Sequence, residues 1–213
     1  MPMHAQPTMA VKKHRLGYRK NWVFDMDGTL TVAAHDFDSF KAAHQLPADQ
    51  PILEFLETVD PERANAIQRA LRAWETQIAQ KALPALDALS LLSALQDRQA
   101  NLSILTRNTK EIALITLEAA GLASFFRPEW ILGRDDAQPK PHPDGLFRLL
   151  AAQSAEPGDT IMVGDYQFDM EAGRAAGVHT ALVLDVPEPP QSWLPYVDLH
   201  VRRLGHLLDS PIH

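Results

Sequence analysis

The stretch WVFDMDGTLT, residues 22–31, constrains the fold more than any other part of this chain. Its first three residues form a short, unbroken apolar run, which is typical of a strand buried on both faces of a parallel sheet. The run ends at Asp25, and a second carboxylate, Asp27, follows just before a glycine. Because parallel sheets open their ligand crevice beyond the carboxyl ends of the strands, both carboxylates are expected at such a crevice. Two anions this close repel each other, so we expect a cation nearby.

Two simpler interpretations of this stretch can be weighed. A calcium loop would need a glycine at its sixth position and a glutamate at its twelfth. Counted from Asp25, those positions hold Leu30 and Asp36, which argues against a calcium loop. Alternatively, the two aspartates simply form a turn after a strand. That alternative would stand if no other part of the chain supplied groups to meet them.

Composition limits the class of protein. The chain has 213 residues, 46% of them hydrophobic and 22% charged, which suits one α/β domain with an insertion. A net charge of −7 argues against a general nucleic-acid binder, and the absence of cysteine excludes disulfides and thiolate metal sites. No apolar run approaches the roughly 18 residues of a membrane span. Residues 1–20 are predicted to be a basic, solvated leader, and we expect a cytoplasmic protein that does not bind membranes and is a monomer or homodimer.

Strand and helix patterns alternate along most of the chain. This alternation predicts a doubly wound parallel sheet. Strands are expected at residues 22–24, 102–105, 130–132, 160–163 and 180–184; helices at residues 85–98, 110–120, 143–153 and 169–176; and a last short strand and helix within residues 199–208.

A helix-rich segment interrupts this alternation after the first strand. Asp60-Pro61-Glu62 has the signature of a helix start, with a capping residue, a proline in the first turn and an acid. Apolar residues then recur at helical spacing up to Ile78, so this helix should bury one face. We therefore expect a small helical domain at residues 35–82, inserted into an α/β core made of residues 21–34 and 83–213.

Polar residues stand where several predicted strands end. Besides Asp25 and Asp27, these are Thr106, Lys140 in a loop between two prolines, and Asp165 with Asp169. Parallel strands bring their carboxyl ends to one edge of the sheet, so these distant residues should converge there.

This set is similar to the four motifs of the haloacid-dehalogenase-like hydrolases, in their phosphatase branch. The motifs read DMDGT at 25–29, LTRN at 105–108, QPKPHP at 138–143 and VGDYQFD at 163–169, in the family's order. The resemblance implies a sheet of strand order 5-4-1-2-3 with a helical cap after the first strand. It also implies a phosphatase similar to phosphoglycolate phosphatases.

The resemblance assigns expected roles to the motif residues. Asp25 would attack phosphorus and form an aspartyl-phosphate, while Asp27 would act as general acid and base. Thr106, Arg107, Asn108 and Lys140 would bind the phosphate group of a small substrate, although Arg107 is as readily interpreted as forming a salt bridge.

The expected cofactor is Mg²⁺, which prefers hard oxygen ligands. By the same resemblance, Asp25, the backbone carbonyl of Asp27 and Asp165 would hold the ion, with Asp169 behind them or acting through water. His35 and Asp36 are interpreted as ordinary loop residues, with a role in substrate choice as the alternative.

Two other functions remain open from the sequence. A phosphosugar mutase of the same superfamily would need a residue of the insertion to manage the protons of a bound hydroxyl group. A phosphorylation-switched receiver domain also carries an aspartate, a threonine and a lysine on a doubly wound sheet. However, receiver domains are shorter and lack a helical insertion.

Overall fold

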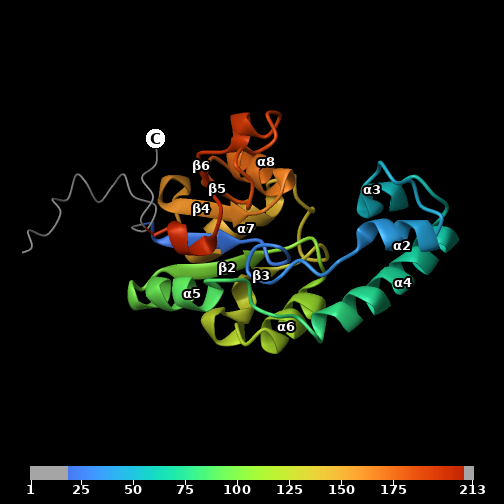
Figure 1. Ribbon diagram of the computed structural model, residues 1–213, viewed down its shortest axis with the longest axis horizontal. Coiled ribbons are helices and arrows are strands. Elements are labelled where there is room, and N and C mark those ends of the chain that lie inside the picture. The colour runs from blue at the N-terminus through green and yellow to red at the C-terminus, as the bar shows by residue number, and fades with distance from the viewer. Residues whose placement is uncertain (1–18, 209–213) are drawn as a thin grey trace, which may run out of the picture.

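The computed structural model describes residues 19–208, and it is organised around one parallel sheet of six strands (Figure 1). The strands lie in the order β3-β2-β1-β4-β5-β6. Their bounds are β1 Asn21–Phe24, β2 Asn101–Leu105, β3 Ile131–Leu132, β4 Thr160–Gly164, β5 His179–Val183 and β6 Leu199–Val201. The predicted fold class is confirmed. The order 5-4-1-2-3 describes the first five strands, and β6 extends the sheet beyond β5.

The central strand β1 explains why its sequence is apolar throughout. It pairs with β2 on one side and β4 on the other, and all four of its residues are buried. Trp22 and Phe24 point into the larger hydrophobic cluster, whereas Val23 points into the cluster on the opposite face, as alternation along a strand requires.

Helices cover both faces of the sheet. Leucines of α5 (Ala88–Asp97) and Leu117 of α6 (Lys110–Ala119) belong to the cluster around Trp22. Leucines of α7 (Asp144–Gln153) and alanines of α8 (Gln167–Ala176) belong to the cluster around Val23. The predicted helices are therefore present, although α5 is shorter than residues 85–98 and the last predicted helix is a single 3-10 turn at Leu204–His206.

Three further helices follow β1 along the chain, before α5, and extend to one side of the sheet (Figure 1). They are α2 (Phe37–Ala43), α3 (Ile52–Leu56) and α4 (Pro61–Ala79). The predicted start of α4 is confirmed, because the Asp60 side chain accepts a hydrogen bond from the Arg63 backbone N–H and Pro61 is in the first turn. We call residues 35–82 the helical insertion. It has a hydrophobic cluster of its own, formed by Phe40, Leu46, Ile52, Leu56, Ile67 and Leu71.

The division of the chain into a leader, a core and an inserted domain stays a prediction, and residues 1–18 of the leader lie outside the described residues. Within residues 19–208, no helix combines the length and the apolar character needed to cross a membrane.

Candidate active site

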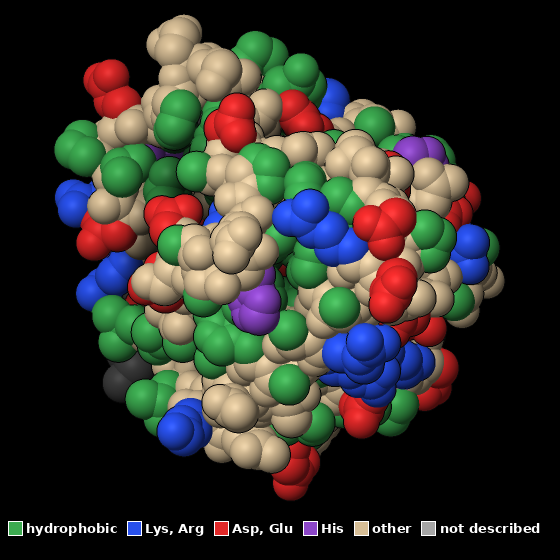
Figure 2. All heavy atoms as spheres, turned by 90° about the vertical axis from the view of Figure 1, so that its right-hand side faces the viewer, with side chains coloured by type: hydrophobic (Ala, Val, Ile, Leu, Met, Phe, Trp, Pro, Cys, Tyr) green, Lys and Arg blue, Asp and Glu red, His purple; other side chains and the backbone are tan. Residues whose placement is uncertain are grey.

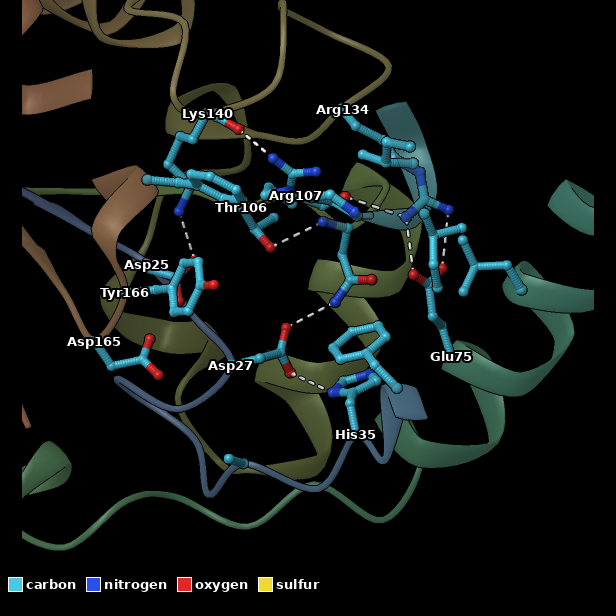
Figure 3. A pocket seen from close by; sticks show the side chains of 18 of the residues that line it. Asp25, Asp27, His35, Glu75, Thr106, Arg107, Arg134, Lys140, Asp165 and Tyr166 are labelled. Carbon is cyan, nitrogen blue, oxygen red and sulfur yellow. Dashed lines mark hydrogen bonds and ion pairs between the residues drawn. The ribbon is translucent and has the colours of Figure 1, made fainter. Parts of the chain in front are cut away.

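The predicted site residues converge in one pocket between the carboxyl edge of the sheet and the helical insertion (Figure 3). Asp25 follows β1, Thr106 follows β2, and Asp165 follows β4. Lys140 comes from the loop between β3 and α7. The convergence expected from parallel strands is therefore present, and the two aspartates after β1 are more than turn formers.

Lys140 is at the centre of this arrangement. Its side chain is buried, and its Nζ atom lies 2.6 Å from Asp25 Oδ1 and 2.6 Å from Asp169 Oδ1. Burial alone would lower the pKa of Lys140, but the two carboxylates outweigh it and raise that pKa. A buried ammonium held this way keeps its charge, and it supplies the cation that the sequence analysis required.

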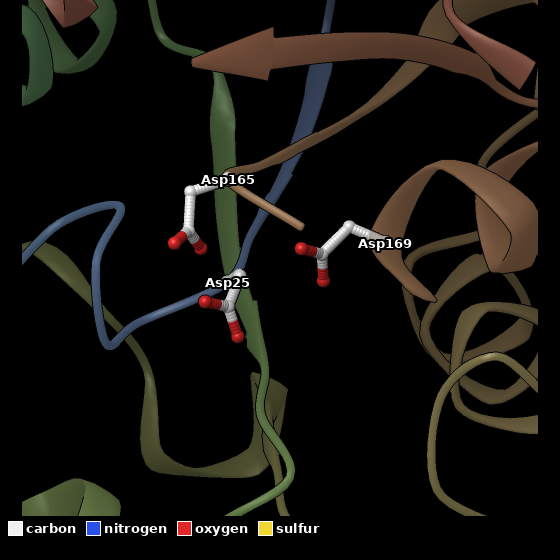
Figure 4. A group of neighbouring side chains, drawn as sticks. All are labelled: Asp25, Asp165 and Asp169. Atoms are coloured by element: carbon white, nitrogen blue, oxygen red, sulfur yellow. The ribbon is translucent and has the colours of Figure 1, made fainter. Parts of the chain in front are cut away.

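Three carboxylates lie around one point (Figure 4). Asp25, Asp165 and Asp169 each offer an oxygen atom, and these atoms all lie within 4.8 Å of one another. Burial, followed by the charges of Asp25 and Asp169, raises the pKa of Asp165 to about 8. Burial likewise raises the pKa of Asp169 to about 6, although Lys140 opposes the shift. Lys140 alone therefore leaves negative charge uncompensated, and this all-oxygen cluster fits a hard divalent cation such as Mg²⁺.

Two glycines allow these carboxylates to approach the backbone. A Cβ atom on Gly28, whose φ is +90°, would lie 2.3 Å from Asp165 Oδ2. A Cβ atom on Gly164 would lie 2.3 Å from Asp169 Cγ. Both distances are far below van der Waals contact, so any side chain at these positions would displace the aspartates.

Asp169 is fixed by two partners. One oxygen accepts from Lys140, and the other accepts a 3.1 Å hydrogen bond from the Tyr166 backbone N–H at the start of α8. Asp165 differs, because its Oδ1 accepts a 3.1 Å hydrogen bond from the Thr29 hydroxyl and, among the described residues, it forms no ion pair with a lysine. Asp169 therefore holds Lys140, whereas Asp165 does not; the expected place of Asp169 behind the metal ligands stays a prediction.

Asp27 lies on the side of the pocket that faces the helical insertion. Its Oδ2 accepts a 2.7 Å hydrogen bond from Asn108 Nδ2, and His35 Nδ1 lies 3.7 Å from its Oδ1. Burial and the nearby Asp25 raise the pKa of Asp27 to about 7, against the effect of Asn108. Burial lowers the pKa of His35, so the imidazole is neutral at pH 7. His35 was interpreted as an ordinary loop residue, yet it contacts this carboxylate.

Thr106 and Asn108 are linked to each other next to the start of α6. The Thr106 hydroxyl oxygen accepts a 3.1 Å hydrogen bond from the Asn108 backbone N–H, and both side chains are buried. Thr109 caps α6, because its side-chain oxygen accepts a hydrogen bond from the Ile112 backbone N–H. The Asn108 side chain donates its hydrogen bond to Asp27, and the Thr106 hydroxyl group lines the pocket.

Arg107 forms a salt bridge across the pocket. Its guanidinium donates to both carboxylate oxygens of Glu54 in α3, at 2.9 Å each. It also donates to the Lys140 backbone carbonyl, and it lies 4.7 Å from the centre of the Phe168 ring. Of the two interpretations of Arg107, the structure places it in the salt bridge.

A second arginine–glutamate pair was not found from the sequence. Arg134 donates to both carboxylate oxygens of Glu75 in α4, at 2.9 Å each, and to the Arg107 backbone carbonyl. Both side chains are largely buried and line the pocket. The two residues are 59 positions apart, and no motif joins them, so the sequence carried no signal for this pair.

The surface at this end of the molecule carries mixed charges. Figure 2 looks at the end that bears the helical insertion, where acidic and basic side chains are interspersed with hydrophobic ones.

Known proteins are similar to this chain over most of its length. Residues 22–183 match the model of the haloacid dehalogenase-like hydrolase family. The chain is 29% identical over 177 residues to pyrophosphatase PpaX of Halalkalibacterium halodurans, covering 76% of this chain and 81% of that protein. It is 28% identical to a haloacid dehalogenase-like hydrolase domain-containing protein of Arabidopsis thaliana, covering 76% of this chain and 69% of the relative.

Solved structures share the fold. A hydrolase from Pseudomonas syringae superposes with a TM-score of 0.71 at 20% identity, covering 88% of this chain and 96% of the other. A predicted phosphoglycolate phosphatase from Haemophilus somnus gives a TM-score of 0.66 at 19% identity, covering 89% and 96%. Because the family model spans most of the chain and its motif residues meet in one pocket, this protein belongs to the haloacid dehalogenase-like hydrolase family.

Proposed function

We propose that this protein is a Mg²⁺-dependent phosphatase that hydrolyses a small organic phosphate ester through an aspartyl-phosphate. The observation that carries the proposal is the contact of Lys140 Nζ with Asp25 and Asp169, beside the oxygen cluster that includes Asp165. A buried carboxylate next to a fixed cation and a metal-ligand cluster is what nucleophilic attack on a dianionic phosphate requires.

In this proposal the two aspartates after β1 divide the chemistry. An oxygen of Asp25 forms a bond to phosphorus while the bond from phosphorus to the leaving alcohol breaks. Asp27 gives its proton to that alcohol and then takes a proton from the water that hydrolyses the aspartyl-phosphate. The pKa of about 7 for Asp27 suits both roles near neutral pH, and the hydrogen bond from Asn108 orients its carboxylate.

Other residues would neutralise and hold the phosphate. Lys140 provides a fixed positive charge beside Asp25, and the Thr106 hydroxyl faces the same pocket. Asn108 reaches the substrate only indirectly, since its side-chain amide is bonded to Asp27. Arg107, paired with Glu54, would border the leaving-group side of the pocket.

Asp25, Asp165 and the backbone carbonyl of Asp27 would hold the ion, and Asp169 would position Lys140 behind them. When bound, Mg²⁺ supplies charge neutralisation for the nucleophile and the phosphate oxygens.

The direct test is release of inorganic phosphate from a panel of phosphate esters, measured with Mg²⁺ and after metal removal with EDTA. We expect turnover that depends on the metal and returns when Mg²⁺ is added back. The panel includes pyrophosphate, because the relative named pyrophosphatase PpaX is 29% identical to this chain. Absence of phosphate release from every compound would reject the proposal.

Two alternatives are addressed by the same assay. A phosphosugar mutase would convert a sugar phosphate into its isomer without net phosphate release, and two neighbours described as putative beta-phosphoglucomutases share only the fold at 15% and 18% identity. Family membership favours a hydrolase over a receiver domain.

The cytoplasmic location and the monomeric or homodimeric state stay predictions.

A further inference from the structure

The pocket between the sheet edge and the helical insertion has a volume of about 560 Å³. That is large enough for an organic group besides the phosphate. The acidic cluster and Lys140 lie at its inner end, while α2, α3 and α4 supply residues at its outer end. Those outer residues decide which leaving group fits.

Both arginines of this pocket are already neutralised by the helical insertion. Both carboxylate oxygens of Glu54 in α3 accept from Arg107 Nη2, and Arg107 Nη1 donates to the Lys140 backbone carbonyl. Glu75 of α4 accepts from Nη1 and Nη2 of Arg134, with one oxygen each. These contacts use N–H groups on the guanidinium edge that a substrate carboxylate or a second phosphate would otherwise occupy. An anionic leaving group would have to displace one of these glutamates.

The other lining cations offer little more. Lys140 is held by Asp25 and Asp169, and Lys41 donates a 2.9 Å hydrogen bond to the Ala48 carbonyl. Among the described residues, six carboxylates and four cations line the pocket. When Asp27 is protonated and one divalent cation is bound, the lining has a single excess positive charge, and the substrate phosphate dianion more than offsets it.

Two exposed aromatic side chains also line the pocket. They are Phe37 of the insertion and Tyr166 of the core, which are 45% and 51% exposed. Phe37 stacks on His35 with ring centres 5.3 Å apart, and Tyr166 meets the Phe168 ring edge-on at 5.0 Å. Each exposed ring is thus supported from behind and presents apolar surface to the cavity.

We propose that the natural substrate is a phosphate monoester whose alcohol part is uncharged and carries a ring, seated between Phe37 and Tyr166. Esters with a second anionic group, such as a carboxylate or another phosphate, are rejected by the paired arginines. This proposal rests on the proposed phosphatase function and specifies its leaving group.

The test compares kcat/KM for phosphate release from benzyl phosphate, 2-phosphoglycolate and pyrophosphate. We expect benzyl phosphate to be preferred by about tenfold or more, since the discrimination comes from ring contacts and unpaired charge. Preference for 2-phosphoglycolate or pyrophosphate would overturn the leaving-group proposal while leaving the phosphatase function intact. Failure of all esters in the wider panel would overturn the function itself.

Substitution of Glu54 tests the electrostatic argument. Glu54→Gln removes the negative charge that neutralises Arg107, so the ratio of kcat/KM for 2-phosphoglycolate to that for benzyl phosphate should rise about tenfold. Glu57→Gln is the matched control, because Glu57 ends the same helix, is exposed and forms no ion pair with Arg107 or Arg134; its ratio should stay unchanged. An equal change for both substrates in Glu54→Gln would contradict the proposal.

Substitution of the two rings tests the apolar argument. Phe37→Ala and Tyr166→Ala should each raise KM for benzyl phosphate about five- to tenfold, with less than a twofold effect on KM for 2-phosphoglycolate. Phe147→Ala is the control, since Phe147 is also 50% exposed but lies on α7 outside the pocket lining. Equal effects on both substrates would show that the rings only support the fold.

Discussion

The sheet edge and the helical insertion face the same pocket, but they are built on different principles. At the sheet edge, parallel strands deliver charged groups to fixed places, and Lys140 binds Asp25 and Asp169 with both partners buried. The insertion has its own small hydrophobic cluster and reaches the core through arginine–glutamate pairs. The comparison suggests that the edge determines the reaction, whereas the insertion determines which molecule undergoes it.

The largest expected effect lies at the sheet edge. Asp25→Asn should lower phosphate release by about 10⁵-fold or more, because removal of a nucleophile abolishes the covalent route. The protein should stay folded by circular dichroism. Asp38→Asn, on the exposed surface of α2, is the control and should keep wild-type turnover. Substantial turnover by Asp25→Asn would contradict the claim that Asp25, at the sheet edge, is the nucleophile.

Loss of the buried ammonium should cost stability. Lys140→Ala leaves Asp25 and Asp169 facing each other without a cation, and it should lower the free energy of unfolding of the metal-free protein by about 3–5 kcal/mol. Adding Asp169→Asn should recover part of that loss, as urea unfolding would measure. Lys81→Ala, at an exposed position, should change stability by less than about 0.5 kcal/mol.

The insertion should respond more mildly. Glu75→Gln leaves the largely buried Arg134 without its full counter-charge, and should lower the free energy of unfolding by about 2 kcal/mol. Glu62→Gln, exposed in the first turn of the same helix, should cost less than about 1 kcal/mol. Equal losses in the two variants would mean that this pair does not hold the insertion to the core.

The smallest effect concerns pH and the metal. The raised pKa of Asp165, about 8 instead of 3.8, means that the folded metal-free protein binds more protons than the unfolded chain between those values. This group therefore lowers metal-free stability as pH rises through that window. Mg²⁺ competes with the proton, so its thermal stabilisation should be larger at pH 8.5 than at pH 6, with apparent affinity changing at most about tenfold per pH unit. Asp165→Asn should weaken this pH dependence and leave the part that comes from Asp27 and Asp169, whose pKa values are about 7 and about 6.

Local signals in the sequence were sufficient for most of the fold. The apolar run of β1, the Asp60-Pro61 start of α4 and the Thr109 cap of α6 each act within a few residues, so their patterns identify them. A last short strand was expected within residues 199–208 and is present as β6, but the expected strand order 5-4-1-2-3 did not place it, and in the structure it pairs with β5 at the edge of the sheet.

Some residues of the candidate site could be predicted from the sequence, whereas contacts between the insertion and the core could not. Residues at strand ends could be predicted, because parallel pairing brings those ends together whatever lies between them. The pairs Arg107–Glu54 and Arg134–Glu75 join positions 53 and 59 residues apart. Their contact depends on how the insertion sits on the core, and residue spacing does not encode that. The burial of His35 beside Asp27 escaped prediction for the same reason.

The position of Lys140 in the chain determines when, during synthesis, the buried cluster of Asp25, Lys140 and Asp169 can form. Its two partners stand 115 residues before it and 29 residues after it in the chain. No contiguous fragment shorter than that span contains all three groups, so a partly synthesised chain carries the proposed nucleophile Asp25 long before it contains Asp169. The proposed hydrolysis would therefore begin only after β4, which precedes Asp169, has paired with β1.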